Sequence, residues 1–345
     1  MASLDIFHQD AFSTLQLTTA VEKVPFLPSM IRSLEIFTEQ PIRTKALAIE
    51  ERTGVLTLIP TSARGGPPAQ RTTERRKLRY FDVPRIAKED TIYADEIHGI
   101  REFGMESELM QVQAEVARRL SGPTGLLADV EYTWENMALG AIGGQVVDAD
   151  GSTVIYNYFD EFQITQPAEI AFDLNAASPV AGALVLKCNT VVRGVVRASQ
   201  GAFLPTSEVY SMCGDGFWDA LINHPDVRTT YLNWQEAKDL RRGQAFESMR
   251  FGGINWFNYR GSDDTTTVGV ATTKAKFFPV KAPGVFQQAM APAETFEWVN
   301  TLGKPVYIIP VIDKDRNMWW KQEVYSYPLF ICTRPGVLYS GRQGT

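Results

Sequence analysis

The sequence predicts an α+β protein with a long two-stranded extension, and three observations support this prediction. Strand-like patterns flank the Gly65-Gly66-Pro67-Pro68 segment, through which neither a helix nor a central strand can continue. Apolar residues between 105 and 120 recur at helical spacing. After an α/β stretch, the last third of the chain returns to strand-rich sequence. We therefore expect a chain that leaves one domain, builds a second and returns to the first.

Composition narrows the class of protein. The chain has 345 residues, a formal net charge of -6, 44% hydrophobic residues and 21% charged residues, which is typical of a folded chain. The acidic balance argues against a dedicated nucleic-acid binder, because such proteins are globally basic. Three widely spaced cysteines predict no disulfide framework and fit a reducing compartment.

Targeting signals are not evident in the sequence. The first residues lack the basic region and apolar core of a signal peptide, and the most apolar run, Pro179 to Leu186, is too short to span a bilayer. We therefore expect no membrane contact and a protein that is made and used in a cytoplasm.

Residues 1–40 are expected to form an N-terminal arm. Two short apolar segments, 26–31 and 34–37, contain aromatic and branched residues that a disordered chain lacks. We expect this arm to dock on another part of the structure.

Residues 41–90, called the extended loop below, contain the two-stranded extension. Strand patterns cover 45–50 and 54–59 before the Gly-Pro segment and 78–83 after it. The stretch 64–79 between them carries six basic residues and one acid. Such an extension gains little by folding back on its own domain, so we expect it to lie on another copy of the protein. A solvated charge run in a loop is the alternative.

Two helices and a hairpin are expected next. Met105, Leu109, Val112, Val116 and Leu120 step by four, three, four and four, so they share one helix face, and Ser121-Gly122-Pro123 ends that helix. A second helix runs through Trp134, Met137, Ala138 and Ile142 and ends at Gly143-Gly144. The segments 145–147 and 154–156 form a hairpin around the turn 148–151.

Residues 175–300 are expected to form a separate α/β lobe. It contains a helix over 180–198, a helix from Phe217 to about Asn223, a strand over 251–259 and a polar loop at 262–265. Beyond it, strands are expected over 305–310 and 318–325, with 329–332 extending the second of these.

Catalytic, metal and cofactor sites are not expected. Cys213 is eleven residues before His224, but it stands in a turn beside Asp215, which disfavours a thiolate. Asp148 and Asp150 begin like a calcium loop whose closing acid is missing, so a hairpin turn is favoured. Phosphate-binding and nucleophile motifs are not found, which shifts the weight away from an enzyme.

The order of segments resembles the lambda-type E-protein family of tailed-bacteriophage major capsid proteins. Three passages carry the resemblance. They are Ser62-Ala63-Arg64-Gly65-Gly66, which enters a basic stretch that returns through Asp82-Val83-Pro84; the helical stretch 101–120 with the following helix and the hairpin 143–156; and the stretch 277–338 with its Phe-Phe-Pro entry.

The resemblance implies the tailed-phage major capsid fold, with four parts. These would be an N-terminal arm (1–40), an extended β-hairpin loop (41–90), a peripheral domain with a long spine helix (91–170 and 301–345) and an axial α/β domain (171–300). It also implies a major capsid protein that self-assembles into hexamers and pentamers, which form the icosahedral phage head around the DNA genome. The inter-subunit contact of the extended loop would involve Arg64, Gly65, Gly66, Arg71, Arg75, Arg76, Lys77 and Arg79.

The resemblance also implies partners. We expect contacts with copies of the chain itself, a separate scaffolding protein, a portal and in some cases a decoration protein, with packaged DNA nearby but bound non-specifically. Assembly would take place in the host cytoplasm. Two alternatives stay open, namely another phage structural component such as a tail or decoration protein, and a cytoplasmic hydrolase with an unmarked carboxylate site.

Overall fold

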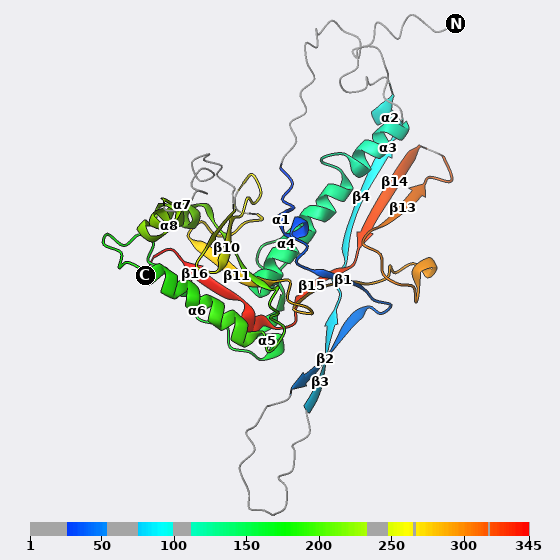
Figure 1. The fold of residues 1–345 in the computed structure, drawn as a ribbon. Helices are drawn as coiled ribbons and strands as arrows, with labels where there is room; N and C mark the ends of the chain where they lie inside the picture. The colour runs from blue at the N-terminus through cyan, green and yellow to red at the C-terminus, as the bar shows by residue number, and fades with distance from the viewer. Residues whose placement is uncertain are drawn as a thin grey trace, which may run out of the picture.

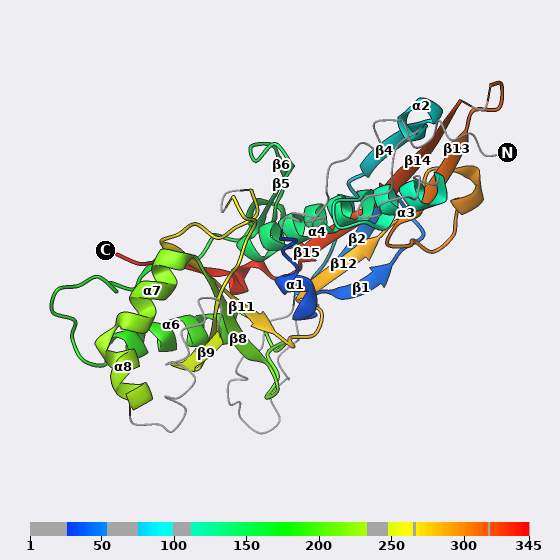
Figure 2. The same cartoon turned by 90° about the horizontal axis from the view of Figure 1, so that it is seen from above.

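The structure, a computed structural model, is an elongated α+β molecule with a projecting hairpin (Figures 1 and 2). It describes residues 26–53, 75–98, 112–232, 248–264, 267–316 and 318–344.

The projecting hairpin is the described part of the extended loop. β2 (Ala46–Thr53) pairs antiparallel with β3 (Arg75–Asp82), and Figure 1 shows this ribbon extending away from the body of the molecule. The expected strands at 45–50 and 78–83 are therefore confirmed, and each is longer than expected at the end away from the body. The expected strand at 54–59 lies outside the described residues.

Two three-stranded sheets form the peripheral part. In one, β14 (Trp319–Ser326) lies between β13 (Tyr307–Ile312) and β4 (Ile86–Tyr93) and is antiparallel to both. In the other, β12 (Phe286–Met290) lies between β1 (Thr38–Pro41), to which it is parallel, and β15 (Pro328–Cys332). The sequence therefore places β14 correctly, but the expectation that 329–332 extends the same strand is wrong, because the chain changes sheets at Tyr327.

The helices of the peripheral part lie along these sheets. They are α1 (Met30–Ser33), α2 (Ala94–Ile97), α3 (Val112–Ser121) and α4 (Leu126–Gly143), with the 3-10 turn η3 (Phe296–Trp298) in the loop before β13. Helix α3 ends before Gly122-Pro123 as expected, whereas the first part of the expected helix, 105–111, lies outside the described residues.

Helix α4 lies in the middle of the molecule, between the peripheral sheets and the α/β lobe (Figure 1). Its first half packs Leu126 and Val130 against Val324 of β14. Its second half places Met137 and Ala141 in the main core. The helix ends as expected, because Gly144 adopts the left-handed conformation (φ 86°) that closes its last turn.

The α/β lobe is built on a mixed six-stranded sheet. Its strands lie in the order β7 (Ile170–Ala171), β16 (Tyr339–Arg342), β11 (Lys274–Val280), β8 (Glu208–Cys213), β10 (Ile254–Asn258) and β9 (Ser248–Phe251). Its helices are α5 (Tyr158–Phe162), α6 (Ala183–Ala198), α7 (Asp215–Asn223) and α8 (Pro225–Leu232), with the 3-10 turn η4 (Pro335–Val337).

Aromatic packing holds this lobe together. Phe172 stacks on Phe277 with ring centroids 5.5 Å apart, and Trp256 meets Phe277 edge-on at 5.3 Å. Trp256 also stacks with Phe217 at 6.0 Å, which fixes α7 to the sheet. The expected helices at 180–198 and 217–223 are confirmed, while β8, β11 and β12 were not expected.

The strand expected over 251–259 is confirmed for β10 (254–258), but its beginning differs, because the chain makes a tight hairpin turn at 252–253. Phe251 of β9 pairs with Ile254 of β10, and Gly252 and Gly253 make the turn with φ angles of 61° and 79°. Two consecutive positive φ angles require this kind of glycine pair. The hairpin of β5 (Gln145–Val147) and β6 (Val154–Asn157) is confirmed.

Strand pairing crosses the expected domain boundaries, as β12 and β16 show. β12 falls in the expected axial segment but pairs with β1 and β15 of the peripheral part. β16 falls in the expected peripheral segment but pairs with β11 and β7 of the lobe.

Candidate assembly surfaces

The extended loop offers the first surface. Of the residues expected to make inter-subunit contacts, Arg64, Gly65, Gly66 and Arg71 lie outside the described residues. The backbone of Arg75 opens β3, and Arg76, Lys77 and Arg79 follow in the same strand. Side chains alternate between the two faces of a strand, so these residues cannot all face the same partner.

One face of β3 meets the body of its own chain. Phe81 is fully buried and stacks on Phe162 of α5 at 5.7 Å. Arg79 places its guanidinium 5.1 Å from the centre of the same ring, and Lys77 donates to Gln163 at 2.9 Å. The root of the hairpin is therefore anchored, contrary to the expectation that it gains little from its own domain.

The opposite face of β3 is turned to solvent. Arg76 pairs with Glu50 across the hairpin at 3.4 Å, and both side chains are more than half exposed. Leu78 is 52% exposed and Tyr80 is 68% exposed. The charge pattern of the sequence pointed to the basic residues and not to Leu78 and Tyr80, although the alternation of residues 76–81 contained the signal.

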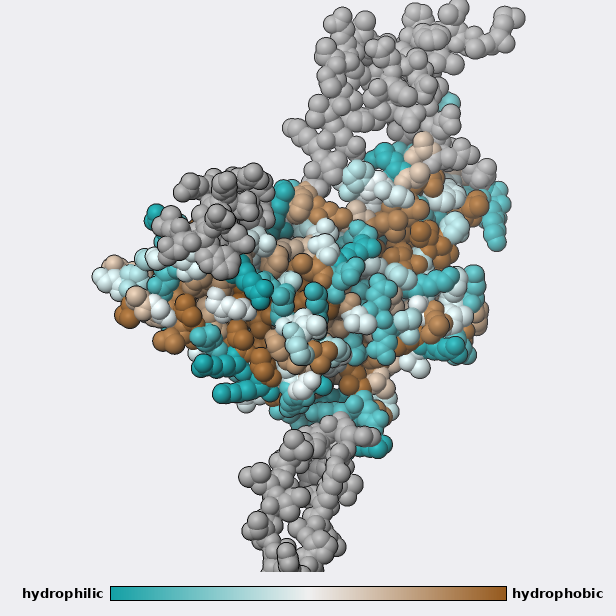
Figure 3. Space-filling model, in the orientation of Figure 1, coloured by the Kyte–Doolittle hydropathy of each residue, from teal (hydrophilic) through white to brown (hydrophobic). Residues whose placement is uncertain are grey.

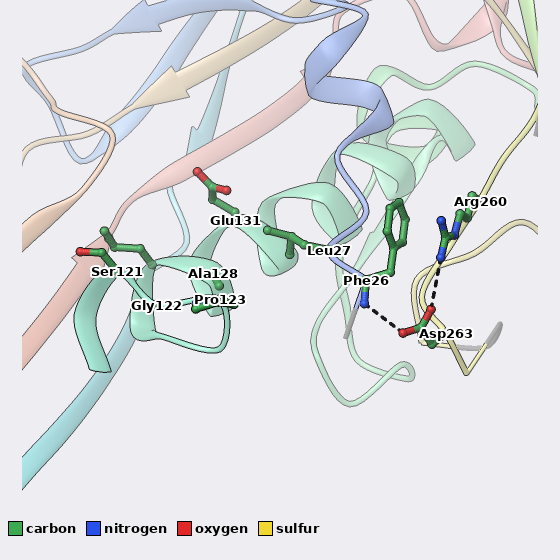
Figure 4. Close-up of a pocket in the computed structure, with 10 residues that line it drawn as sticks. Phe26, Leu27, Ser121, Gly122, Pro123, Ala128, Glu131, Arg260 and Asp263 are labelled. Atoms are coloured by element: carbon green, nitrogen blue, oxygen red, sulfur yellow. Dashed lines mark hydrogen bonds and ion pairs between the residues drawn. The ribbon is translucent and has the colours of Figure 1, made fainter. Parts of the chain in front are cut away.

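A second surface lies where the N-terminal strap (residues 26–37) enters the body. Figure 4 shows Phe26 lying against Arg260, whose guanidinium is 3.7 Å from the ring centroid. The backbone N–H of Phe26 donates to Asp263 at 2.9 Å. A groove of about 730 Å³ opens beside the strap, between the start of α4 and the 260–263 loop.

The strap then crosses α4 and joins a sheet. Phe37 meets the rings of Phe286 and Phe330 edge-on, each at 5.2 Å, directly before β1 pairs with β12. The strap thus contacts the lobe, α4 and the β1–β12–β15 sheet in turn. The described part of the expected N-terminal arm is a docked segment, as expected.

Glu135 of α4 holds the middle of this strap. Its buried carboxylate accepts from the N–H of Ile31 at 3.0 Å and from the hydroxyl of Tyr259 at 3.1 Å. Burial raises the pKa of this carboxyl above its ordinary value, and the donated hydrogen bonds oppose the rise. A single side chain therefore links the strap, α4 and the end of β10.

The tip of the peripheral part is held by a charge network. Glu115 of α3 is 3% exposed and accepts from Arg118 at 2.7 and 2.8 Å and from Arg119 at 2.6 Å. These hydrogen bonds, with that of Arg118 foremost, lower the pKa of Glu115 to about 2. Arg119 continues to Asp90 of β4 and Glu96 of α2, so the network joins three elements.

An apolar groove of about 650 Å³ lies beside this network. Ile92, Ile97, Leu120, Ile312 and Trp320 are among the residues that line it. Figure 3 shows hydrophobic surface on this end of the molecule, over α3 and the neighbouring strands. Elsewhere in the peripheral part, Phe296 of η3 is fully exposed. Exposed apolar surface is a common feature of protein–protein interfaces, so this end of the molecule is a further candidate assembly surface.

The residues considered for chemistry are unsuited to it. Cys213 is fully buried, and burial raises its pKa to about 12, so it stays a thiol. Asp150 accepts from the hydroxyl groups of Ser152 and Thr153 within its own turn, as the hairpin interpretation requires. Within the described ranges, no group of three or more His, Cys, Asp or Glu residues could hold a metal ion. None of the helices in those ranges is long and apolar enough to cross a membrane.

Comparison with known proteins gives consistent matches over most of the chain. The family model for phage major capsid protein E matches residues 13–343. The chain is 25% identical to the major capsid protein of Salmonella phage Felix O1 over 96% of both chains. It is also 25% identical to that of Pseudomonas phage KPP10 over 88% of this chain and 90% of the relative.

Solved structures share the fold at low identity. The capsid of cyanophage P-SCSP1u matches with a TM-score of 0.51 and 10% identity, over 96% of this chain and 91% of that one. The capsid of the native GTA particle matches with a TM-score of 0.52 and 9% identity, over 96% and 95%. At these identities the likeness concerns the fold alone.

Proposed function

The chain belongs to the phage major capsid protein E family, and from this premise we propose how its surfaces build a shell. It is a major capsid protein, a structural component of the virion capsid and not an enzyme. Copies of it self-assemble into the capsid lattice. The family match favours a major capsid protein over the alternatives of a tail protein, a decoration protein and a hydrolase.

In this proposal, the extended loop of one subunit lies across a neighbouring subunit within hexamers and pentamers. The observation that carries it is the solvent-facing side of β3, which exposes Leu78 and Tyr80 on a hairpin that projects from the body. A two-stranded ribbon with exposed apolar residues is poorly stable alone and gains from burial against another surface.

The predicted contact residues then have different roles. Arg76 shares the outer face with Leu78 and Tyr80 and meets the neighbour directly, and we propose the same for Arg64, Gly65, Gly66 and Arg71. We also propose that Arg75 contacts the neighbour, because it opens β3 at the end away from the body. Lys77 and Arg79 face their own body and act through it. Exposed ion pairs contribute only about 0–1 kcal/mol each, so apolar burial supplies most of the energy and the charges set the register.

The wider arrangement is also proposed. Ring contacts between copies are heterologous and close by symmetry around the DNA genome. The four-part division of the chain is kept, with β12 assigned to the peripheral domain and β16 to the axial domain because of their pairing. A separate scaffolding protein, a portal and a decoration protein are the proposed partners. We place assembly in the host cytoplasm, with packaged DNA held by proximity only.

Removing the apolar face of the hairpin tests the proposal. Leu78→Ser with Tyr80→Ser is expected to leave the chain folded, by circular dichroism, and to prevent closed shells, by electron microscopy. Val180→Ser is the matched control, because Val180 is an exposed apolar residue in a loop of the lobe. Normal shells from the double variant, or equal loss in the control, would contradict a specific role for the extended loop.

A further inference from the structure

We propose that Arg79 sets the direction in which the extended loop leaves the body, and that this direction makes the shells uniform. The inference rests on the proposed contact of the extended loop with a neighbouring subunit. It concerns the root of the hairpin rather than the surface that meets the neighbour. The group is called the Arg79 clamp below and consists of Arg79, Glu51, Glu161 and Phe162.

The clamp uses carbonyl groups that a helix end leaves free. At the end of α5, Gln163 adopts a left-handed conformation (φ 56°) and donates its N–H to the carbonyl of Asp160 at 3.1 Å. The N–H of Ile164 donates to the carbonyl of Phe159 at 2.9 Å. The next two carbonyls, those of Glu161 and Phe162, accept from the guanidinium of Arg79. Cationic donors are favoured at this negative end of a helix.

The same guanidinium also reaches the other strand of the hairpin. Its Nε donates to Glu51 of β2 at 3.3 Å, and its central carbon lies 5.1 Å from the centre of the Phe162 ring. One side chain therefore ties β2, β3 and α5 together. These three bonds start from three different nitrogens of the guanidinium, whereas the three donors of an ammonium group share one nitrogen, so the clamp depends on the planar fork of arginine.

Burial separates Arg79 from the other basic residues of its strand. The side chain of Arg79 is 12% exposed, whereas that of Arg76 is 63% exposed. Lys77 and Phe81 lie on the same face and contact Gln163 and Phe162, so three alternate residues of β3 grip the end of α5. Tyr156 adds a bond from its hydroxyl to the carbonyl of Asp82 at 2.8 Å.

A fixed exit angle matters because identical subunits must close a lattice. Each hairpin has to reach an equivalent place on its neighbour, and a variable angle yields contacts that fail to close. The clamp removes this freedom before assembly begins, since all of its members belong to one chain.

Arg79→Ala in the full-length chain tests the clamp, with Arg76→Ala as a control of the same charge change on the outer face. In the unassembled chain, Arg79→Ala is expected to speed amide hydrogen exchange across 46–51 and 76–82 by about tenfold, with little change in the α/β lobe. Its particles are expected to vary in size by electron microscopy. Arg76→Ala is expected to leave exchange unchanged.

The outcomes separate the clamp from the proposed contact. Amide hydrogen exchange equal to that of the parent, or particles of uniform size, from Arg79→Ala would overturn the clamp. If Arg79→Ala loosens the hairpin while Leu78→Ser with Tyr80→Ser still forms normal shells, the proposed contact fails and the local clamp stands. If Arg79→Ala does not fold, Arg79→Lys replaces it. This variant keeps the charge, and exchange equal to that of the parent would refute the need for the fork.

Discussion

Two buried carboxylates show how single residues hold this subunit together. Glu135 receives donors from the strap and from Tyr259, while Glu115 receives the two arginines that follow it on α3. The two differ in the charge of their partners. Neutral donors do not offset burial at Glu135, so its pKa rises, whereas guanidinium groups lower that of Glu115. The contributions of the two carboxyl groups to the stability of the fold are therefore expected to change in opposite directions as the pH rises.

The parent chain is expected to lose stability as the pH rises, because the folded state disfavours the ionised form of Glu135. Glu135→Gln is expected to remove this loss. A raised pKa in the folded state means that the contribution of Glu135 is full below about 4.5 and is lost as the pH rises through the raised value. Glutamine keeps an acceptor oxygen for Ile31 and Tyr259 without ionising. The measurement is the thermal unfolding midpoint of the unassembled chain from pH 4 to pH 8. Glu131→Gln, one turn earlier on α4, is the control, and parallel curves for parent and Glu135→Gln would refute this assignment.

Glu115→Gln is expected to weaken the peripheral tip at neutral pH and to flatten its acid response. With a lowered pKa, the contribution of Glu115 is full above about 4.5 and is lost as the pH falls towards about 2. The variant should therefore unfold at lower temperature than the parent at pH 7 and approach the parent in acid. Asp129→Asn removes an exposed pair with Lys88 and should change little. An unchanged midpoint at pH 7 would show that the network does not stabilise the tip.

At the scale of elements, helix α4 and the β2–β3 hairpin have different roles. Helix α4 packs against β14 at one end and the main core at the other, so it sets the spacing of the two parts. The β2–β3 hairpin is anchored at its root by Phe81, and its outer face stays free for a neighbour. Charge on that outer face can be changed without disturbing the root.

Arg75→Glu with Arg76→Glu is expected to leave the subunit folded and to block shell formation. Arg76 faces solvent, so the fold has little to lose, whereas two reversed charges at the contact would repel an acidic neighbour. Circular dichroism checks the fold and electron microscopy the particles. Lys314→Glu with Arg316→Glu makes the same charge change in the turn between β13 and β14. Normal particles from the Arg75 and Arg76 variant would show that these charges do not guide assembly.

At the scale of the molecule, the subunit is elongated and returns on itself. The chain builds the peripheral part and then the lobe, then runs back through β13 and β14, and finally places β16 in the sheet of the lobe. Neither part is a continuous stretch of sequence, so relative movement of the two parts must bend α4 or the strands that cross between them.

Because the chain belongs to a family of capsid proteins, expression of the full chain should yield shells or ring-shaped oligomers rather than a stable monomer. We expect closed polyhedral particles on co-expression with the proposed scaffolding protein, and hexamer or pentamer rings or irregular shells from the chain alone. Electron microscopy with sedimentation velocity distinguishes these products. A single small oligomer in both preparations would contradict the proposed arrangement of hexamers and pentamers.

Local pattern was enough to predict the elements whose signals are local. Helix α4, the β5–β6 hairpin, helix α6 and the two strands of the extended loop follow from apolar periodicity and from glycine or proline at their ends. The order of these segments also indicated the family. These features depend on neighbours in the sequence, so the sequence alone determined them.

Only the tertiary structure decided which partners the segments take. The change of sheet at Tyr327, the pairing of β16 with the lobe and the inward turn of Arg79 depend on residues far away in the chain. Charge alone made Arg76 and Arg79 look equivalent, whereas the strand register buries one against α5 and exposes the other. Alternation along β3 places Arg76 and Arg79 on opposite faces, but which face is buried depends on α5, a partner about 80 residues away in the chain that a local pattern does not identify.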